Sequence, residues 1–126
     1  MSPVTLVFFI VLLAILAYMF WRYYAFKKSV TQIDNETFKA MMRHSQIIDL
    51  RDPASFQRKH ILGARNFSER QFAVALSALR KDKPILLYEG SRPTFAPKAA
   101  RQLKAAGYTD LYFLKTGFDA WDGKVK

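Results

Sequence analysis

The stretch from Pro84 to Gly107, PILLYEGSRPTFAPKAARQLKAAG, decides the fold of this chain. It starts with four consecutive apolar residues, 85–88, which are typical of a strand that is covered on both faces. Residues 90–95 are rich in turn formers and predict a loop. Pro97 then suits the first turn of a helix, and Gly107 suits the position just after its end. The stretch therefore predicts a buried strand that is joined through a loop to a helix.

The flanking sequence repeats this alternation of strands and helices. Short apolar runs at 46–50 and 111–114 predict two more buried strands, and residues 29–33 predict a linker or a first strand. Asp34 or Asn35 can cap a helix that runs to Arg43, and Asp52 before a proline predicts a short helix. Ser68 with a glutamine three residues later predicts a capped helix that ends before Pro84. Parallel strands need such crossovers, so we expect an α/β fold with an open parallel sheet and helices on both faces.

The first 21 residues carry no acidic or basic side chain. Each such side chain would cost roughly 2.5 to 3.5 kcal/mol at the centre of a bilayer. The apolar run 4–21 has the length at the low end of the range that spans a hydrocarbon core of about 30 Å. A secretory signal peptide would need a basic start and a small-residue cleavage site, and a buried helix would need a larger domain around it. We therefore expect a transmembrane anchor over residues 1–26, followed by one domain over residues 27–126.

The basic residues predict the orientation of this anchor and its surroundings. Arg22, Lys27 and Lys28 follow the apolar run, which places the N-terminus outside the cell membrane and the domain in the cytoplasm. The absence of cysteine fits that reducing compartment. The formal net charge of +10 falls entirely after residue 21, so the same three side chains are expected to contact anionic lipid. No nucleic acid is expected, because aromatic and basic residues are not interleaved as single strands require.

Three groups of motifs follow one another in the second part of the chain. They are Ile48-Asp49-Leu50-Arg51 with His60-Ile61-Leu62-Gly63-Ala64-Arg65-Asn66; Pro84-Ile85-Leu86-Leu87-Tyr88; and Ala99-Ala100, Leu103, Gly107-Tyr108, Leu111, Leu114, Gly117-Phe118 and Ala120-Trp121. In this order and spacing they resemble the rhodanese-like domains over residues 29–123. The resemblance implies a parallel five-stranded α/β sheet with an active-site loop after the central strand.

The same resemblance exposes a departure in that loop. Active members have a cysteine at its start, whose thiolate becomes a persulfide, but this sequence has Glu89 there and contains no cysteine. Sulfur transfer and the related phosphatase and arsenate reductase chemistries all need that thiolate. Thr94 stands where the family often has a basic residue, and Lys59 stands where it has a glycine. We therefore expect no catalytic residue and no cofactor.

The loop could still bind something, and the sequence leaves two arrangements open. In the first, the Glu89 carboxylate fills the ring of loop amides itself; in the second, it points outward and the loop binds a small anion or an acidic group of a partner. The candidate binding residues are Glu89, Gly90, Ser91, Arg92, Thr94 and Phe95. We favour the first arrangement, because a neighbouring carboxylate repels a second anion. Amide donors should also lower the pKa of Glu89, which would make it a poor general acid.

The expected function is a membrane-tethered, catalytically inactive binding or scaffold module with a protein partner. The alternatives are an enzyme that uses Glu89 in a sulfurtransferase-like pocket and a clamp on the lipid surface. His60 and the pair Asp49 and Arg51 are expected to make structural contacts, and two histidines without cysteine predict no metal site. Basic residues at 98, 101 and 104 lie on one helix, and they form either a solvated face or a patch for lipid or a partner.

Overall fold

The computed structural model describes residues 2–126, apart from the side chains of Lys27 and Ser29, so the predicted lipid contact of Lys27 lies outside the described residues. Its centre is a sheet of five parallel strands in the order β1-β5-β4-β2-β3. The bounds are β1 Thr31–Ile33, β2 Gln46–Asp49, β3 Arg65–Asn66, β4 Ile85–Tyr88 and β5 Leu111–Leu114. β4 lies in the middle, with Ile85 opposite Gln46 on one side and opposite Leu111 on the other. All four residues of β4 are buried, which confirms the strand predicted from its apolar run.

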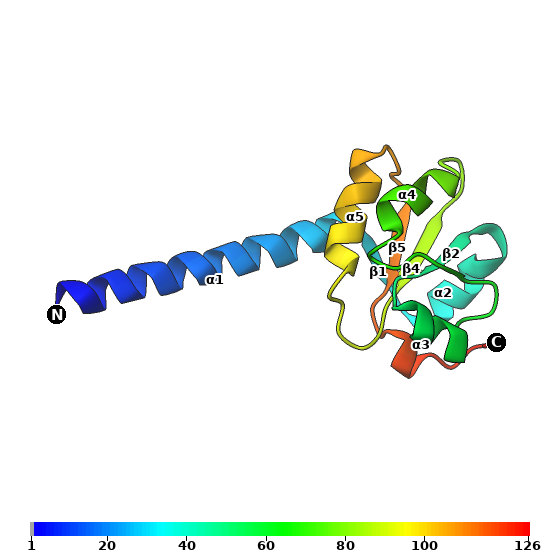
Figure 1. Ribbon diagram of the computed structural model, residues 1–126, viewed down its shortest axis with the longest axis horizontal. Coiled ribbons are helices and arrows are strands. Elements are labelled where there is room, and N and C mark those ends of the chain that lie inside the picture. The colour runs from blue at the N-terminus through cyan, green and yellow to red at the C-terminus, as the bar shows by residue number, and fades with distance from the viewer. Residues whose placement is uncertain (1) are drawn as a thin grey trace.

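Helices cover both faces of this sheet, as the sequence predicts (Figure 1). On one face lie α4 (Phe72–Ala75), α5 (Ala96–Ala105) and the end of α1 (Pro3–Ser29). They enclose the larger of two apolar clusters, which includes Phe72, Leu87, Phe95, Leu103 and Phe113. On the other face lie α2 (Asn35–Met41) and α3 (Pro53–Arg58). The second cluster, which includes Phe38, Ile47, Leu86, Tyr88 and Leu114, packs beneath them.

Two of the three helix starts that were predicted from a side-chain cap are confirmed by their capping contacts. The Asp34 carboxylate accepts the Thr37 amide at 2.9 Å, and the Asp52 carboxylate accepts the Ser55 amide at 3.1 Å. The third start is wrong, because the Ser68 side chain is buried and caps nothing. The Ser68 carbonyl instead accepts the Gln71 amide at 3.0 Å and closes a turn. As a result α4 starts only at Phe72 and lasts four residues before a 3-10 turn follows.

α1 is a single helix that extends out of the domain and also enters its core (Figure 1). Residues Pro3–Phe26 are long and apolar enough to cross a membrane, and an 18-residue window within them has a mean hydropathy of 2.7 with none of that window buried in the protein. The last turn of the helix behaves differently. Phe26 packs its ring 5.6 Å from that of Phe113, and Val30, just after the helix, is almost fully buried. The helix therefore continues directly into the apolar cluster of the domain.

Candidate functional site at the end of the central strand

The loop between β4 and α5, residues 89–95, is fixed at its base by the segment that follows β5. The Phe118 amide donates to the Glu89 carbonyl oxygen at 2.8 Å. Gly117 lies against the peptide group of Gly90. The backbone of Gly117 has a φ of +76° and a ψ of 172°. A Cβ atom at Gly117 would lie 2.4 Å from the Gly90 carbonyl oxygen. Only glycine fits this conformation and this approach, so the turn after β5 determines where the loop begins.

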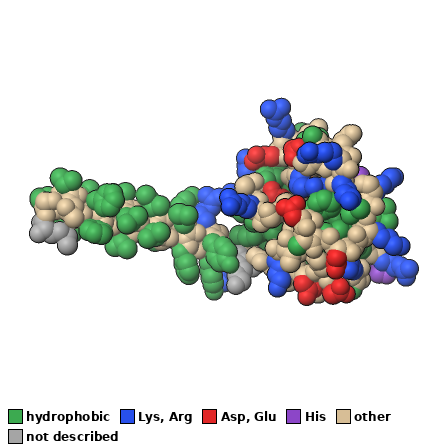
Figure 2. All heavy atoms as spheres, turned by 90° about the horizontal axis from the view of Figure 1, so that it is seen from below, with side chains coloured by type: hydrophobic (Ala, Val, Ile, Leu, Met, Phe, Trp, Pro, Cys, Tyr) green, Lys and Arg blue, Asp and Glu red, His purple; other side chains and the backbone are tan. Residues whose placement is uncertain are grey.

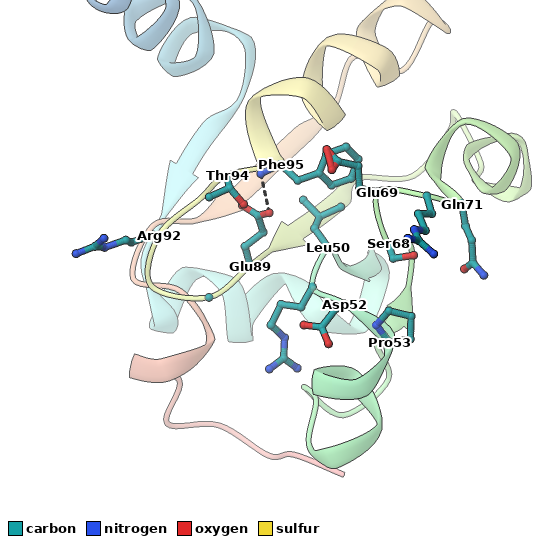
Figure 3. Close-up of a pocket in the computed structure, with 13 residues that line it drawn as sticks. Leu50, Asp52, Pro53, Ser68, Glu69, Gln71, Glu89, Arg92, Thr94 and Phe95 are labelled. Carbon is teal, nitrogen blue, oxygen red and sulfur yellow. Dashed lines mark hydrogen bonds between the residues drawn. The ribbon is translucent and has the colours of Figure 1, made fainter.

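The Glu89 side chain turns inward and binds the start of α5 (Figure 3). One carboxylate oxygen accepts the Phe95 amide at 2.9 Å, and the other accepts the Ala96 amide at 3.2 Å. The residue is only 4 % exposed. These two N–H groups belong to the first turn of a helix, where amides have no partner within the helix. The carboxylate thus occupies the amide ring itself, which is the first of the two arrangements expected from the sequence.

The expected direction of the Glu89 pKa is wrong. Burial raises the pKa of this carboxyl above its ordinary value of 4.5, and the amide bonds from Phe95 and Ala96 oppose that rise without overcoming it. The sequence indicated the amide donors, but it did not show how completely the surrounding chain excludes water. A raised pKa suits a carboxyl group that donates a proton near neutral pH. The direction of this shift therefore favours the alternative in which the protein is an enzyme that uses Glu89.

A cleft of about 700 Å³ opens beside Glu89 (Figure 3). Its lining comes from three segments: Leu50, Arg51, Asp52 and Pro53 after β2; Ser68, Glu69, Arg70 and Gln71 before α4; and Glu89, Gly90, Arg92, Thr94 and Phe95 from the loop. The structure therefore brings together five of the six predicted binding residues, whereas Ser91 is exposed and does not line the cleft. Arg92 lies at the rim, and its side chain points away from Glu89.

Sequence reasoning missed the two other segments of the cleft. A signal for the first was present, because the carboxyl ends of neighbouring parallel strands meet at one edge of a sheet. β2 pairs with β4, and Asp49 lies opposite Tyr88, so residues 50–53 must lie beside Glu89. No comparable signal existed for residues 68–71, because their position depends on the buried turn at Ser68 that replaced the predicted helix start.

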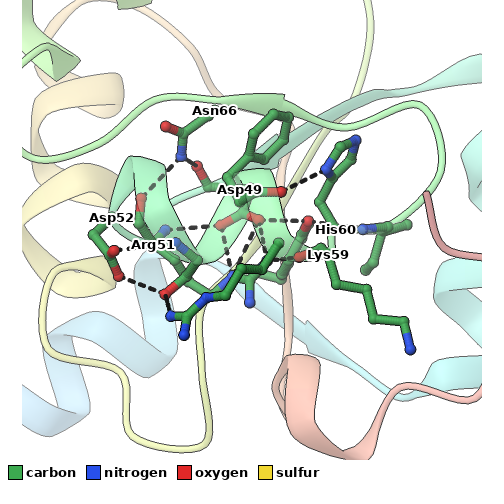
Figure 4. Close-up of polar contacts among 11 residues, drawn as sticks. Asp49, Arg51, Asp52, Lys59, His60 and Asn66 are labelled. Atoms are coloured by element: carbon green, nitrogen blue, oxygen red, sulfur yellow. Dashed lines mark hydrogen bonds and ion pairs between the residues drawn. The ribbon is translucent and has the colours of Figure 1, made fainter.

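A buried polar cluster adjoins the cleft through Arg51, which lines the cleft and binds Asp49 (Figure 4). Asp49 is fully buried, and its carboxylate accepts the Arg51 guanidinium at 2.7 Å and the Tyr88 hydroxyl at 2.7 Å. Tyr88 in turn accepts the Ile61 amide at 3.1 Å, and burial together with the Asp49 charge raises the pKa of this phenol. The Asp49–Arg51 ion pair and a contact of 2.7 Å between His60 Nδ1 and the Phe56 carbonyl confirm the structural contacts predicted for these residues.

The chemistry available in the cleft follows from these contacts. The Arg51 guanidinium is held by Asp49 and by the Lys59 carbonyl at 2.6 Å. The Asp52 carboxylate caps α3, and its bonds to Ser55 lower its pKa. Within residues 2–126, no three His, Cys, Asp or Glu side chains lie close enough to hold a metal ion. The cleft therefore combines apolar lining with charged side chains of both signs.

Comparisons with known proteins agree with this architecture. The family model described as Rhodanese-like domain matches residues 34–124. The chain is 37% identical over 117 residues to the uncharacterized protein YqhL of Bacillus subtilis (strain 168), covering 93% of this chain and 92% of that one. It is 33% identical over 79 residues to the thiosulfate sulfurtransferase GlpE of Pseudomonas aeruginosa (strain LESB58), covering 61% and 69%. The solution structure of the rhodanese-like domain of Alr3790 from Anabaena superposes with a TM-score of 0.64 at 29% identity, covering 75% and 77% of the two chains.

Proposed function

Since this chain belongs to the rhodanese-like domain family, we propose that it is a membrane-tethered binding module without sulfurtransferase activity. The order of its motifs assigns Glu89 to the position of the family's reactive cysteine, at the start of the loop after the central strand. Sulfur transfer needs a thiolate that attacks the sulfur donor and retains one sulfur atom as a persulfide. A carboxylate cannot hold sulfur in this way, and the sequence contains no cysteine that could replace it.

One observation carries this proposal: the Glu89 carboxylate already binds the amides of Phe95 and Ala96. An anionic substrate group would have to displace a buried negative charge that makes two hydrogen bonds. The cleft beside the carboxylate remains open. Its rim offers the exposed Thr94 and Arg92 side chains, which can bind polar or acidic groups of a partner protein without any chemical step.

A second candidate function is acid–base catalysis by Glu89, which the raised pKa of this carboxyl favours. A general acid must reach the reacting atom within hydrogen-bond distance. Both Glu89 oxygens are directed at backbone amides, and only 4 % of the residue is exposed. We rank this candidate second because the carboxyl would first have to leave its amide partners.

We further propose that α1 anchors the protein in the cell membrane as a single pass, with the N-terminus outside and the domain in the cytoplasm. The support is the apolar helix Pro3–Phe26 and the basic flank after it, because basic loops are retained on the cytoplasmic side. Arg22 donates to the Tyr18 hydroxyl at 2.8 Å, and Lys28 lies 4.9 Å from the Tyr24 ring. Such pairs of aromatic and basic side chains are typical of the headgroup level, where these cations can contact anionic lipid.

The absence of sulfur transfer can be tested on the full chain in detergent. Wild-type protein should show no transfer of sulfur from thiosulfate to cyanide, and turnover by the wild type would refute the proposal. The Glu89→Cys variant tests the assignment of this position. Its thiolate should take the outer sulfur of thiosulfate and release sulfite, which leaves a persulfide that intact-mass measurement detects. A folded Glu89→Cys protein that gains no sulfur would contradict the assignment of position 89.

The binding role can be tested in native membranes with a photoreactive amino acid at Thr94, on the cleft rim. We expect a discrete cross-linked product from this position. The matched control places the same group at Arg43, which is exposed on the α2 side of the sheet. Equal cross-linking from both positions would show that the cleft has no particular role in recognition.

A further inference from the structure

A second, smaller groove lies where α1 meets α5. It has a volume of about 250 Å³ and is lined by Ala25 and Phe26 of α1 and by Pro97, Arg101 and Lys104 of α5. The three α5 residues are spaced by four and three positions, so they form one stripe along the helix. This stripe faces α1, while the buried face of α5, which includes Leu103, packs on the sheet.

The groove is electropositive. Neither α1 nor α5 contains an acidic residue, whereas α5 carries Lys98, Arg101 and Lys104. Arg101 and Lys104 are exposed, and in the described part of the chain neither forms an ion pair. Figure 2 shows Lys and Arg side chains gathered where the long helix joins the domain. Two cations beside an apolar helix surface are suited to a ligand with an anionic head and an apolar body.

The position of the groove along α1 indicates which ligand that is, and this step rests on the membrane anchor proposed above. Phe26 follows Trp21, the last residue of the apolar run, by five residues, or about 7.5 Å of helix. The headgroup layer is about 5–8 Å thick on each side of a bilayer. The groove therefore lies at the level of the lipid phosphates. α5 crosses the direction of α1 on the side from which α1 extends (Figure 1), so its basic stripe lies along the membrane surface.

We infer that this groove binds the headgroup of an anionic phospholipid in the leaflet next to the domain. The planar Arg101 guanidinium matches the geometry of a phosphate and can donate two parallel hydrogen bonds to it. Lys104, one turn further along α5, supplies a second positive charge. The acyl chains would follow the apolar surface of α1. A zwitterionic lipid carries a cation that both side chains would repel, so the charge of the groove selects an anionic lipid.

The test uses the full chain in nanodiscs that contain phosphatidylcholine and phosphatidylglycerol, with the retained lipid identified by native mass spectrometry. We expect wild-type protein to retain phosphatidylglycerol selectively. Removing both charges with Arg101→Gln and Lys104→Gln should weaken this retention roughly 30-fold. The matched control, Arg43→Gln with Lys59→Gln, removes two exposed charges that follow helices on the opposite face. It should leave retention nearly unchanged, because distant charges are screened.

Four outcomes would overturn the inference. Equal retention of the two lipids, or equal loss in the control and test variants, would show that the groove does not select an anionic lipid. Competition by free glycerol phosphate as strong as that by the lipid would show a site for a soluble anion. In these three cases, incorporation of the chain into the discs still supports the anchor. A wild-type chain that stays outside the discs would overturn the anchor and the inference together.

Discussion

Replacing Glu89 by alanine measures how much its carboxylate stabilises the domain. The change leaves the Phe95 and Ala96 amides without acceptors, and a buried donor without a partner costs about 1–3 kcal/mol. Removing a buried charge recovers some desolvation energy, which offsets part of the loss. We therefore expect Glu89→Ala to lower the free energy of unfolding by about 2–3 kcal/mol.

The assay is urea unfolding of the full chain in detergent micelles, combined with hydrogen exchange at the Phe95 and Ala96 amides. Both amides should exchange faster in Glu89→Ala, beyond what the global loss of stability explains. Glu69→Ala is the matched control, because it removes an exposed carboxylate from the same cleft and should change stability by less than about 0.5 kcal/mol. If the two substitutions cost the same, the carboxylate does not hold the loop.

Three further predictions use the same unfolding measurement. Burial raises the folded-state pKa of Glu89 above 4.5, so the folded state binds this proton more tightly than the unfolded state does. The free energy of unfolding should therefore fall as pH rises from about 4.5 to the folded-state pKa. The difference in this free energy between wild type and Glu89→Gln should show the same slope with pH, and a difference that does not change with pH would contradict it. Gly117→Ala should cost about 2–4 kcal/mol, because its Cβ would meet Gly90; a neutral effect would disprove this close approach. Asp49→Asn should cost about 3–5 kcal/mol, because it leaves Arg51 without its buried partner; a loss below about 1 kcal/mol would refute this role.

Most of the sheet could be predicted from the sequence because its strands are short apolar runs between strong turn signals. Ile85–Tyr88 and Leu111–Leu114 are where their composition placed them. The starts of α2 and α3 were also predictable, since an aspartate at the cap needs only contacts within three residues. These features are local in sequence, and therefore visible in it.

The features that sequence reasoning missed depend on contacts between distant segments. Ser68 has the spacing of a helix cap, but tertiary packing buries its side chain and turns the chain differently. The pKa of Glu89 follows its burial by the folded chain more than its adjacent amides. The C-terminal segment pairs with the chain beside His60, where the Lys126 amide donates to the His60 carbonyl at 2.9 Å. No pattern in residues 122–126 indicates that pairing.

The burial of Phe26 has a practical consequence for work on this protein. A fragment that starts at residue 27, chosen to be free of the apolar helix, would lack an aromatic ring that fills the domain interior against Phe113. Losing such a ring typically costs about 3–5 kcal/mol, out of a total stability of about 5–15 kcal/mol for a domain. The same ring holds the end of α1 against the apolar cluster of the domain. With α1 in a membrane, as proposed above, this contact would give the cleft a fixed orientation relative to the bilayer.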